Sequence, residues 1–151
     1  MILFQDKTFY LWSPFGHDNR PIKLLSGTSF PDEILFAKVS MDSKLLSVLP
    51  GGRKSVSVYD LTTKKKWNIT IKNIAGNQIL PGGLIWSEHG GNSQDLAVVT
   101  SKGIELHKVS SARGQCKLSR SIMQTTHLFC YEPNFRAVLL GCIIRDGTIE
   151  I

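Results

Sequence analysis

Three adjacent lysines, Lys64, Lys65 and Lys66, are the most conspicuous residues that could do chemistry in this 151-residue chain. Their ammonium groups could bind the phosphates of nucleic acid or of acidic lipids. The simpler interpretation is a solvated turn, because most short charge runs are exposed. Close by, the tripeptide 68–70 (Asn-Ile-Thr) matches the acceptor pattern for N-glycosylation, which would imply secretion. The fold and the location of the chain must decide between these interpretations.

Cysteine and histidine positions do not predict a metal site. Cys116, Cys130 and Cys142 are odd in number and widely spaced, so no disulfide framework is implied. A zinc site needs a Cys-x-x-Cys pair or closely spaced histidines, and His127 near Cys130 stands alone. We therefore expect no metal, and we expect the cysteines to act as small apolar residues of the core.

Catalysis is not expected either. The serines include no Gly-x-Ser-x-Gly elbow of the kind that presents a nucleophile. Neither "PGGR" (50–53) nor "PGGL" (81–84) continues into a phosphate-binding loop, so both are predicted to be tight strand turns. His17, His89 and His107 have no carboxylate and nucleophile grouped near them, and we expect satisfied structural histidines. The chain is therefore not expected to be an enzyme, and no cofactor or small-molecule substrate is predicted.

Composition indicates a globular chain. The chain is 42% hydrophobic and 20% charged, and it is long enough to bury one core. Its longest uncharged apolar run, 137–144, is less than half of the roughly 20 residues that a membrane span requires. The start, "MILFQDKTFYLW", lacks the basic leader of a secretory signal. We therefore expect a cytosolic location, where the acceptor pattern at 68–70 has no use.

Short apolar alternations separated by turn residues predict a chain that is nearly all β. The first complete round predicts strands at Ile34–Val39, Leu45–Leu49, Ser55–Tyr59 and Trp67–Ile71. The three lysines then lie in the hairpin before the last of these strands. The second round predicts strands at Leu84–Trp86, Asp95–Thr100, Ile104–Val109 and Lys117–Ile122, and a third round begins at His127–Tyr131 and continues through Ala137–Ile144.

The rounds repeat with the period of a propeller blade. Phe36, Trp86 and Phe129 occupy comparable places in the first strands, about 40 to 50 residues apart, which is the period of four-stranded blades. We therefore predict part of a WD-repeat-like β-propeller with about three four-stranded antiparallel blades, incomplete at both ends. Its segments are predicted as a partial blade at 1–30, blades at 31–75 and 79–123, and a partial blade at 126–151. The predicted blade-core residues are Phe36, Val58, Trp86, Ile104 and Phe129.

Five segments resemble, in order and spacing, the N-terminal propeller of the regulator subunit of the Mon/Ccz complex, the colon-cancer-associated Mic-like family. The closest is "TSKGIELHKV" (100–109), which is similar to a Gly-Ile-Glu-aromatic strand of that family. The likeness spans nearly the whole chain. The other four segments are "GHDNRPIKL" (16–24), "VSMDSKLLSV" (39–48), "GLIWS" (83–87) and "FCYEPNFRAVLL" (129–140).

The resemblance implies a non-catalytic scaffold subunit of the exchange complex that activates the late-endosomal Rab GTPase. Its partners would be the two exchange-factor subunits, and its role would support endosome maturation, lysosomal delivery and autophagy. It would be cytoplasmic and peripheral on the late endosome or lysosome, with Lys64, Lys65 and Lys66 as a possible contact to acidic membrane. The alternative is a general protein-interaction or nucleic-acid-binding propeller, based on a pI of about 9.4. Nucleic acid is the less expected partner, because aromatic residues are not interleaved with the basic ones.

Overall fold

The computed structural model describes residues 2–5, 8–11, 20–26, 33–87, 93–123, 143–145 and 148–150. Within these ranges, all regular structure is β. The strands are β1 (Ile2–Gln5), β2 (Thr8–Leu11), β3 (Ile22–Ser26), β4 (Ile34–Val39), β5 (Leu45–Pro50), β6 (Ser55–Asp60), β7 (Lys66–Thr70), β8 (Ile79–Trp86), β9 (Gln94–Thr100), β10 (Gly103–Ser110), β11 (Gln115–Met123), β12 (Ile143–Arg145) and β13 (Thr148–Glu150). The predicted all-β class is confirmed. No helix in the described part of the chain is long and apolar enough to cross a membrane.

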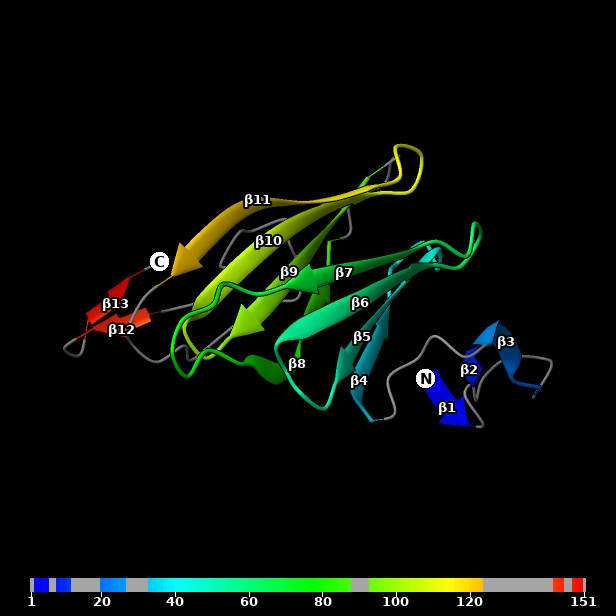
Figure 1. The fold of residues 1–151 in the computed structure, drawn as a ribbon, viewed down its shortest axis with the longest axis horizontal. Helices are drawn as coiled ribbons and strands as arrows, with labels where there is room; N and C mark the ends of the chain where they lie inside the picture. Colours follow the sequence, from blue (N-terminus) through cyan, green and yellow to red (C-terminus); the bar gives the residue numbers. More distant parts are fainter. Residues whose placement is uncertain are drawn as a thin grey trace.

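The strands form antiparallel sheets in which each strand pairs with its neighbour in the chain. The sheet orders are β1-β2-β3, β4-β5-β6-β7, β8-β9-β10-β11 and β12-β13. Figure 1 shows the two four-stranded sheets side by side, and their first strands, β4 and β8, contact each other. This arrangement is that of neighbouring propeller blades, which stack around a common axis by their first strands.

Turn chemistry sets the ends of the strands in the β4–β7 sheet. Asp42 Oδ1 accepts hydrogen bonds from the Ser40 hydroxyl (2.7 Å) and the Lys44 N–H (3.1 Å), which closes the β4–β5 turn. In the β6–β7 turn, Asp60 Oδ1 likewise accepts hydrogen bonds from the Thr62 and Thr63 N–H groups. The predicted strand at Ile34–Val39 is confirmed as β4, and the other three predicted strands of this round match β5, β6 and β7 to within one residue.

One predicted turn is wrong. The segment 81–84 ("PGGL") lies inside β8, where the pairing with β9 shifts register between Ile79 and Leu84. Gly82 has a φ of +76 degrees, a left-handed conformation that glycine adopts readily and that is common at bulges. A Cβ on Gly83 would lie only 2.7 Å from the Val99 carbonyl oxygen, so the glycine permits a close approach of two backbones. By contrast, 50–53 ("PGGR") forms the predicted turn, at the end of β5.

Both faces of the β4–β7 sheet are apolar and covered, as expected for stacked blades. Neighbouring residues of β5 point to opposite faces, so Leu45 and Leu46 belong to different clusters. The largest cluster draws on both four-stranded sheets and contains Leu45, Leu49, Val56, Val58, Ile69, Ile71, Ile79, Leu84, Trp86, Leu96, Val98 and Val109. A second cluster joins Phe9 of β2 to the opposite face. Packing between the sheets therefore provides the main apolar burial.

The structure places the predicted core residues unequally. Val58 (0% exposed) and Trp86 (4%) lie in the cluster between the two sheets, and Ile104 (2%) lies in the cluster on the other face of β8–β11. Phe36 is only partly buried where it packs against the first cluster. Phe129 lies outside the described residues, together with the strands predicted at His127–Tyr131 and most of Ala137–Ile144, and with His17, His89, Cys130 and Cys142.

Candidate functional site

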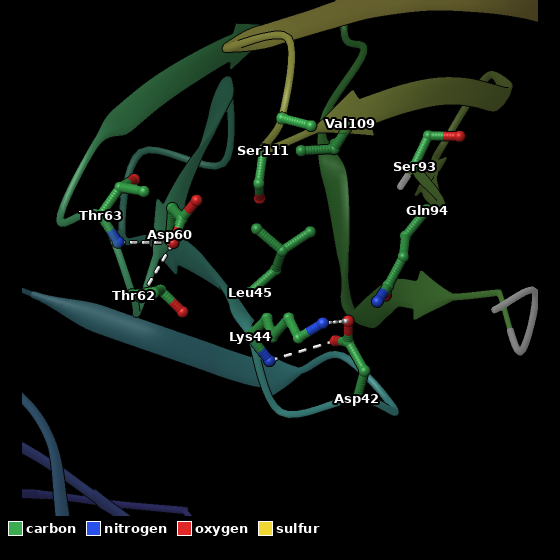
Figure 2. Close-up of a pocket in the computed structure, with 11 residues that line it drawn as sticks. Asp42, Lys44, Leu45, Asp60, Thr62, Thr63, Ser93, Gln94, Val109 and Ser111 are labelled. Carbon is green, nitrogen blue, oxygen red and sulfur yellow. Dashed lines mark hydrogen bonds and ion pairs between the residues drawn. The ribbon is translucent and has the colours of Figure 1, made fainter. Parts of the chain in front are cut away.

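A groove with a volume of about 340 Å³ lies between the two four-stranded sheets at one rim (Figure 2). The β4–β5 and β6–β7 turns lie at the same end of their sheet, because strands of a meander alternate in direction. The end of β8, the start of β9 and the β10–β11 turn lie at the corresponding end of the neighbouring sheet (Figure 1). The groove is lined by Asp42, Lys44, Leu45, Asp60, Thr62, Thr63, Ser93, Gln94, Val109, Ser111 and Ala112.

Asp42 contributes a negative charge to the groove. Burial alone would raise the pKa of its carboxyl group, but hydrogen bonds from the Ser40 hydroxyl and the Lys44 N–H, together with the nearby Gln94 side chain, hold that pKa below its usual value. Lys44 Nζ lies 3.8 Å from Asp42 Oδ2, and this lysine side chain is 65% exposed. An exposed pair at this distance neutralises the carboxylate only weakly.

Asp60 contributes a second carboxylate, which is almost fully buried (1% exposed). Its Oδ1 accepts hydrogen bonds from the backbone N–H groups of Thr62 and Thr63, each at 2.8 Å. Burial favours the neutral acid, but the Thr63 N–H, the nearby Ser111 hydroxyl and the Thr62 N–H outweigh it and lower the pKa of Asp60. The groove therefore holds two ionised carboxylates at neutral pH, beside apolar walls formed by Leu45 and Val109.

The predicted lysine hairpin lies at the same rim. Lys64 and Lys65 are in the β6–β7 turn, Lys66 is the first residue of β7, and all three side chains are exposed. Lys64 has a φ of +61 degrees, a left-handed conformation that marks a tight turn. Nearby, Asn68 lies on β7, where its Oδ1 accepts a hydrogen bond from the Ser57 hydroxyl (3.1 Å).

The β10–β11 turn adds further positive charge beside this hairpin. Trp67 Nε1 donates a hydrogen bond to the Gly114 carbonyl oxygen (3.3 Å), which joins the start of β7 to the β10–β11 turn. Lys108, Arg113 and Lys117 line a second hollow of about 360 Å³ with Ser93, Ser110 and Gln115. We call the set Lys64, Lys65, Lys66, Lys108, Arg113 and Lys117 the basic rim. The charge at this rim therefore comes from two sheets, which the lysine run alone does not indicate.

Glu105 and His107 form a buried pair on β10 that links the two four-stranded sheets. This pair was not predicted from the sequence. His107 Nε2 lies 3.1 Å from Glu105 Oε2, and both side chains are buried. Glu105 Oε1 accepts a hydrogen bond from the Lys72 N–H (2.8 Å), just after the β4–β7 sheet. Burial lowers the pKa of His107, and Glu105 opposes that shift only in part. The i, i+2 spacing was the available signal, because such residues share one face of a strand.

Two features bear on chemistry in the part of the chain that the structure describes, namely the clustering of metal ligands and the state of the cysteine. No group of three or more His, Cys, Asp or Glu residues there could hold a metal ion. Cys116 is a free, partly buried cysteine, and burial raises the pKa of its thiol to about 11. A thiol with so high a pKa is a poor nucleophile. The groove and the basic rim are therefore candidates for recognition of a partner.

Comparison with solved structures identifies the class of fold as a WD40-type β-propeller, of which this chain forms a part. The chain is similar to the crystal structure of the WD40 domain of SCAP from fission yeast, with a TM-score of 0.51 and 13% sequence identity. The similarity covers 81% of this chain and 30% of that one, so the chain spans less than a third of the structure it matches. The predicted partial propeller is thereby confirmed. No protein-family model matches the chain, and no curated protein matches it.

Proposed function

We propose that this chain is part of a non-catalytic scaffold that binds other proteins. The observation that carries the proposal is the WD40-type fold, in which turns from neighbouring sheets meet on one rim. Loops held on a rigid scaffold are well suited to recognition, because their residues can vary without disturbing the packed sheets. The groove supplies charged and apolar groups on such a rim.

We further propose that the scaffold serves the Mon/Ccz exchange complex, which activates the late-endosomal Rab GTPase. Five sequence segments in the expected order support this assignment. Three of them coincide with strand pairs or strand ends: 39–48 spans the β4–β5 turn, 83–87 ends β8, and 100–109 spans the β9–β10 turn. The motifs are structural, so they relate the chain to this family without assigning a catalytic role to it.

Co-purification tests this assignment. The intact protein that carries this chain is expected to co-purify with the two exchange-factor subunits from cells extracted under mild conditions. A tagged, unrelated WD40-type propeller should recover neither subunit. Recovery of the intact protein without them would remove the Mon/Ccz assignment and leave a general interaction scaffold.

The basic rim supports a peripheral contact of this scaffold with acidic membrane. Lys108 and Lys117 are direct cross-strand partners on β10 and β11. Like charges opposite each other destabilise a sheet, so this placement has a cost in folding that an acidic ligand would offset. The lysine hairpin extends the same positive surface onto the neighbouring sheet. We propose that this surface lies against the late endosome or lysosome.

Replacing Lys64, Lys65 and Lys66 by serine is expected to weaken binding to acidic liposomes while leaving the fold intact. Each lysine near the surface contributes about 1 kcal/mol of salt-sensitive attraction. Exposed turn charges affect folding by about 0.5 kcal/mol or less per site. Lys66 is the exception, because its Nζ lies 5.3 Å from the centre of the Tyr59 ring and a cation–π contact adds about 0.5–1 kcal/mol. Liposome co-sedimentation and thermal melting measure the two effects.

A matched control removes the same charge at the other end of the sheets. The control replaces Arg53, Lys72 and Lys102 by serine. These residues lie in the β5–β6 turn, the β7–β8 connection and the β9–β10 turn, respectively. This control should bind acidic liposomes almost as well as the unchanged protein. Equal binding by all three proteins at low salt would remove the membrane role, and tighter binding to single-stranded DNA than to liposomes would favour nucleic acid instead.

A further inference from the structure

Two buried oxygen atoms in the groove have no hydrogen-bond partner in the described part of the chain, namely Asp60 Oδ2 and Gln94 Oε1. Both residues are nearly inaccessible to water, at 1% and 5% exposed. The Ser111 hydroxyl is near enough to stabilise the Asp60 charge, yet it does not meet the geometry of a hydrogen bond to Oδ2. Buried acceptors are normally paired, because leaving them unpaired is costly. A donor that enters the groove could therefore pair with these two atoms.

The charge of the groove indicates what kind of donor fits. Asp42 and Asp60 line it, and Lys44 is the one cation among its described lining residues. The ammonium of Lys44 pairs with Asp42 and is mostly exposed, so it does not serve Asp60. Figure 2 shows Asp60 and Gln94 entering the groove from opposite sheets. A ligand with positive charge and several N–H groups that point in different directions would suit both acceptors and the charge of the groove.

We propose that this groove binds the guanidinium group of an arginine side chain that a partner protein inserts between the two sheets. A guanidinium presents five N–H donors in a plane and is more weakly hydrated than an ammonium, so it suits a half-buried site with acceptors on two walls. Leu45 and Val109 line the groove and would contact the apolar part of the arginine side chain. This inference rests on the proposed role as a protein-binding scaffold.

The basic rim restricts the sequence around that arginine. Lys64 directly follows the groove residues of the β6–β7 turn, and Arg113 directly follows those of the β10–β11 turn. A second basic residue next to the inserted arginine would face these cations. Acidic residues in the same places would be attracted to them. The expected partner segment therefore carries one arginine flanked by aspartate or glutamate.

A synthetic peptide with one arginine between glutamates tests the proposal against the intact protein. Titration calorimetry should detect binding of this peptide. The same peptide with citrulline, which keeps the shape but loses the charge, should bind at least about tenfold more weakly, since charge-assisted hydrogen bonds are the strong ones. Equal binding of the two peptides, or no binding of the arginine peptide up to about 1 mM, would overturn the proposal.

Two variants locate the binding in the groove. Asp60→Asn keeps an oxygen that can accept the N–H bonds of the β6–β7 turn but removes the charge, and it should lose at least about tenfold in affinity. Ala112→Arg places a side chain at the exposed edge of the groove and should compete with the peptide even if Asp60→Asn fails to fold. Asp95→Asn, outside the groove, should bind normally. Unchanged affinity in folded Asp60→Asn and in Ala112→Arg would overturn the proposal.

The same experiments separate this inference from the scaffold role. If the intact protein recovers its partner subunits but does not prefer arginine to citrulline, the groove is not the arginine site and the scaffold role stands. If it prefers arginine but recovers neither exchange-factor subunit, the arginine site stands and the Mon/Ccz assignment fails.

Discussion

Truncation of Trp86 to alanine is expected to lower the free energy of unfolding by about 3–5 kcal/mol, the range for large aromatic side chains deleted from a core. Trp86 is 4% exposed and lies in the cluster shared by the two four-stranded sheets. Its Nε1 donates hydrogen bonds to the Lys38 carbonyl oxygen (3.2 Å) and the Ser47 hydroxyl (3.1 Å), both on the neighbouring sheet. The substitution therefore removes packing and two polar links at once.

Chemical denaturation of the intact protein, followed by circular dichroism, measures this loss without relying on the fluorescence of the residue removed. Trp86→Phe helps to separate the two contributions, because it retains an aromatic ring but loses the N–H together with part of the indole volume. We expect that control to cost about 1–2 kcal/mol, close to the effect of one or two neutral hydrogen bonds. A loss below about 1 kcal/mol for Trp86→Ala would contradict the docking of the sheets through this residue.

Most strands of the two complete rounds could be predicted because their signals are local, but β8 begins at Ile79, five residues before the strand predicted at Leu84–Trp86. Alternating apolar residues define β6, and a short apolar run defines β5. Asp42 and Asp60 form turns with N–H groups two or three residues away. The segment 81–84 was predicted wrongly because proline and glycine mark a bulge as readily as a turn. The close approach of Gly83 to Val99 makes this segment a bulge within β8, and that contact arises only when β8 pairs with β9.

Burial and the groove depend on packing that no local pattern records. Phe36 was predicted as a core residue alongside Trp86, yet it is only partly buried. The same holds for the whole of β4, in which no residue is buried. The groove brings Asp60 and Ser111 together from different sheets, and their separation in the sequence gives no sign of this. The sequence shows the lysine run. It does not show that Arg113 lies beside that run, because the Trp67–Gly114 hydrogen bond that brings the β10–β11 turn to β7 forms only in the fold.

Replacement of Glu105 by alanine is expected to lower the free energy of unfolding by about 2–4 kcal/mol. Glu105 is 1% exposed and serves two partners, His107 and the Lys72 N–H. Hydrogen bonds to a charged group are worth about 1.5–3 kcal/mol, and a buried donor left unpaired adds about 1–3 kcal/mol. The loss stays below that of a broken buried ion pair, because burial favours neutral His107 and no uncompensated charge is left behind. Chemical denaturation at neutral pH measures the effect.

Glu105→Gln gives a matched control and a test of the histidine, since glutamine retains an acceptor for Lys72 but loses the charge. In the folded protein, burial lowers the pKa of His107 below its ordinary value of 6.5. The unfolded chain therefore binds more protons near that pH, so stability is complete above about pH 6.5 and falls as the pH drops below it. Glu105 opposes this shift, and its replacement by glutamine should make the loss between about pH 7 and pH 5 steeper. His107→Gln should flatten the profile. An unchanged slope in Glu105→Gln would show that Glu105 and His107 do not interact as the 3.1 Å contact between their side chains implies.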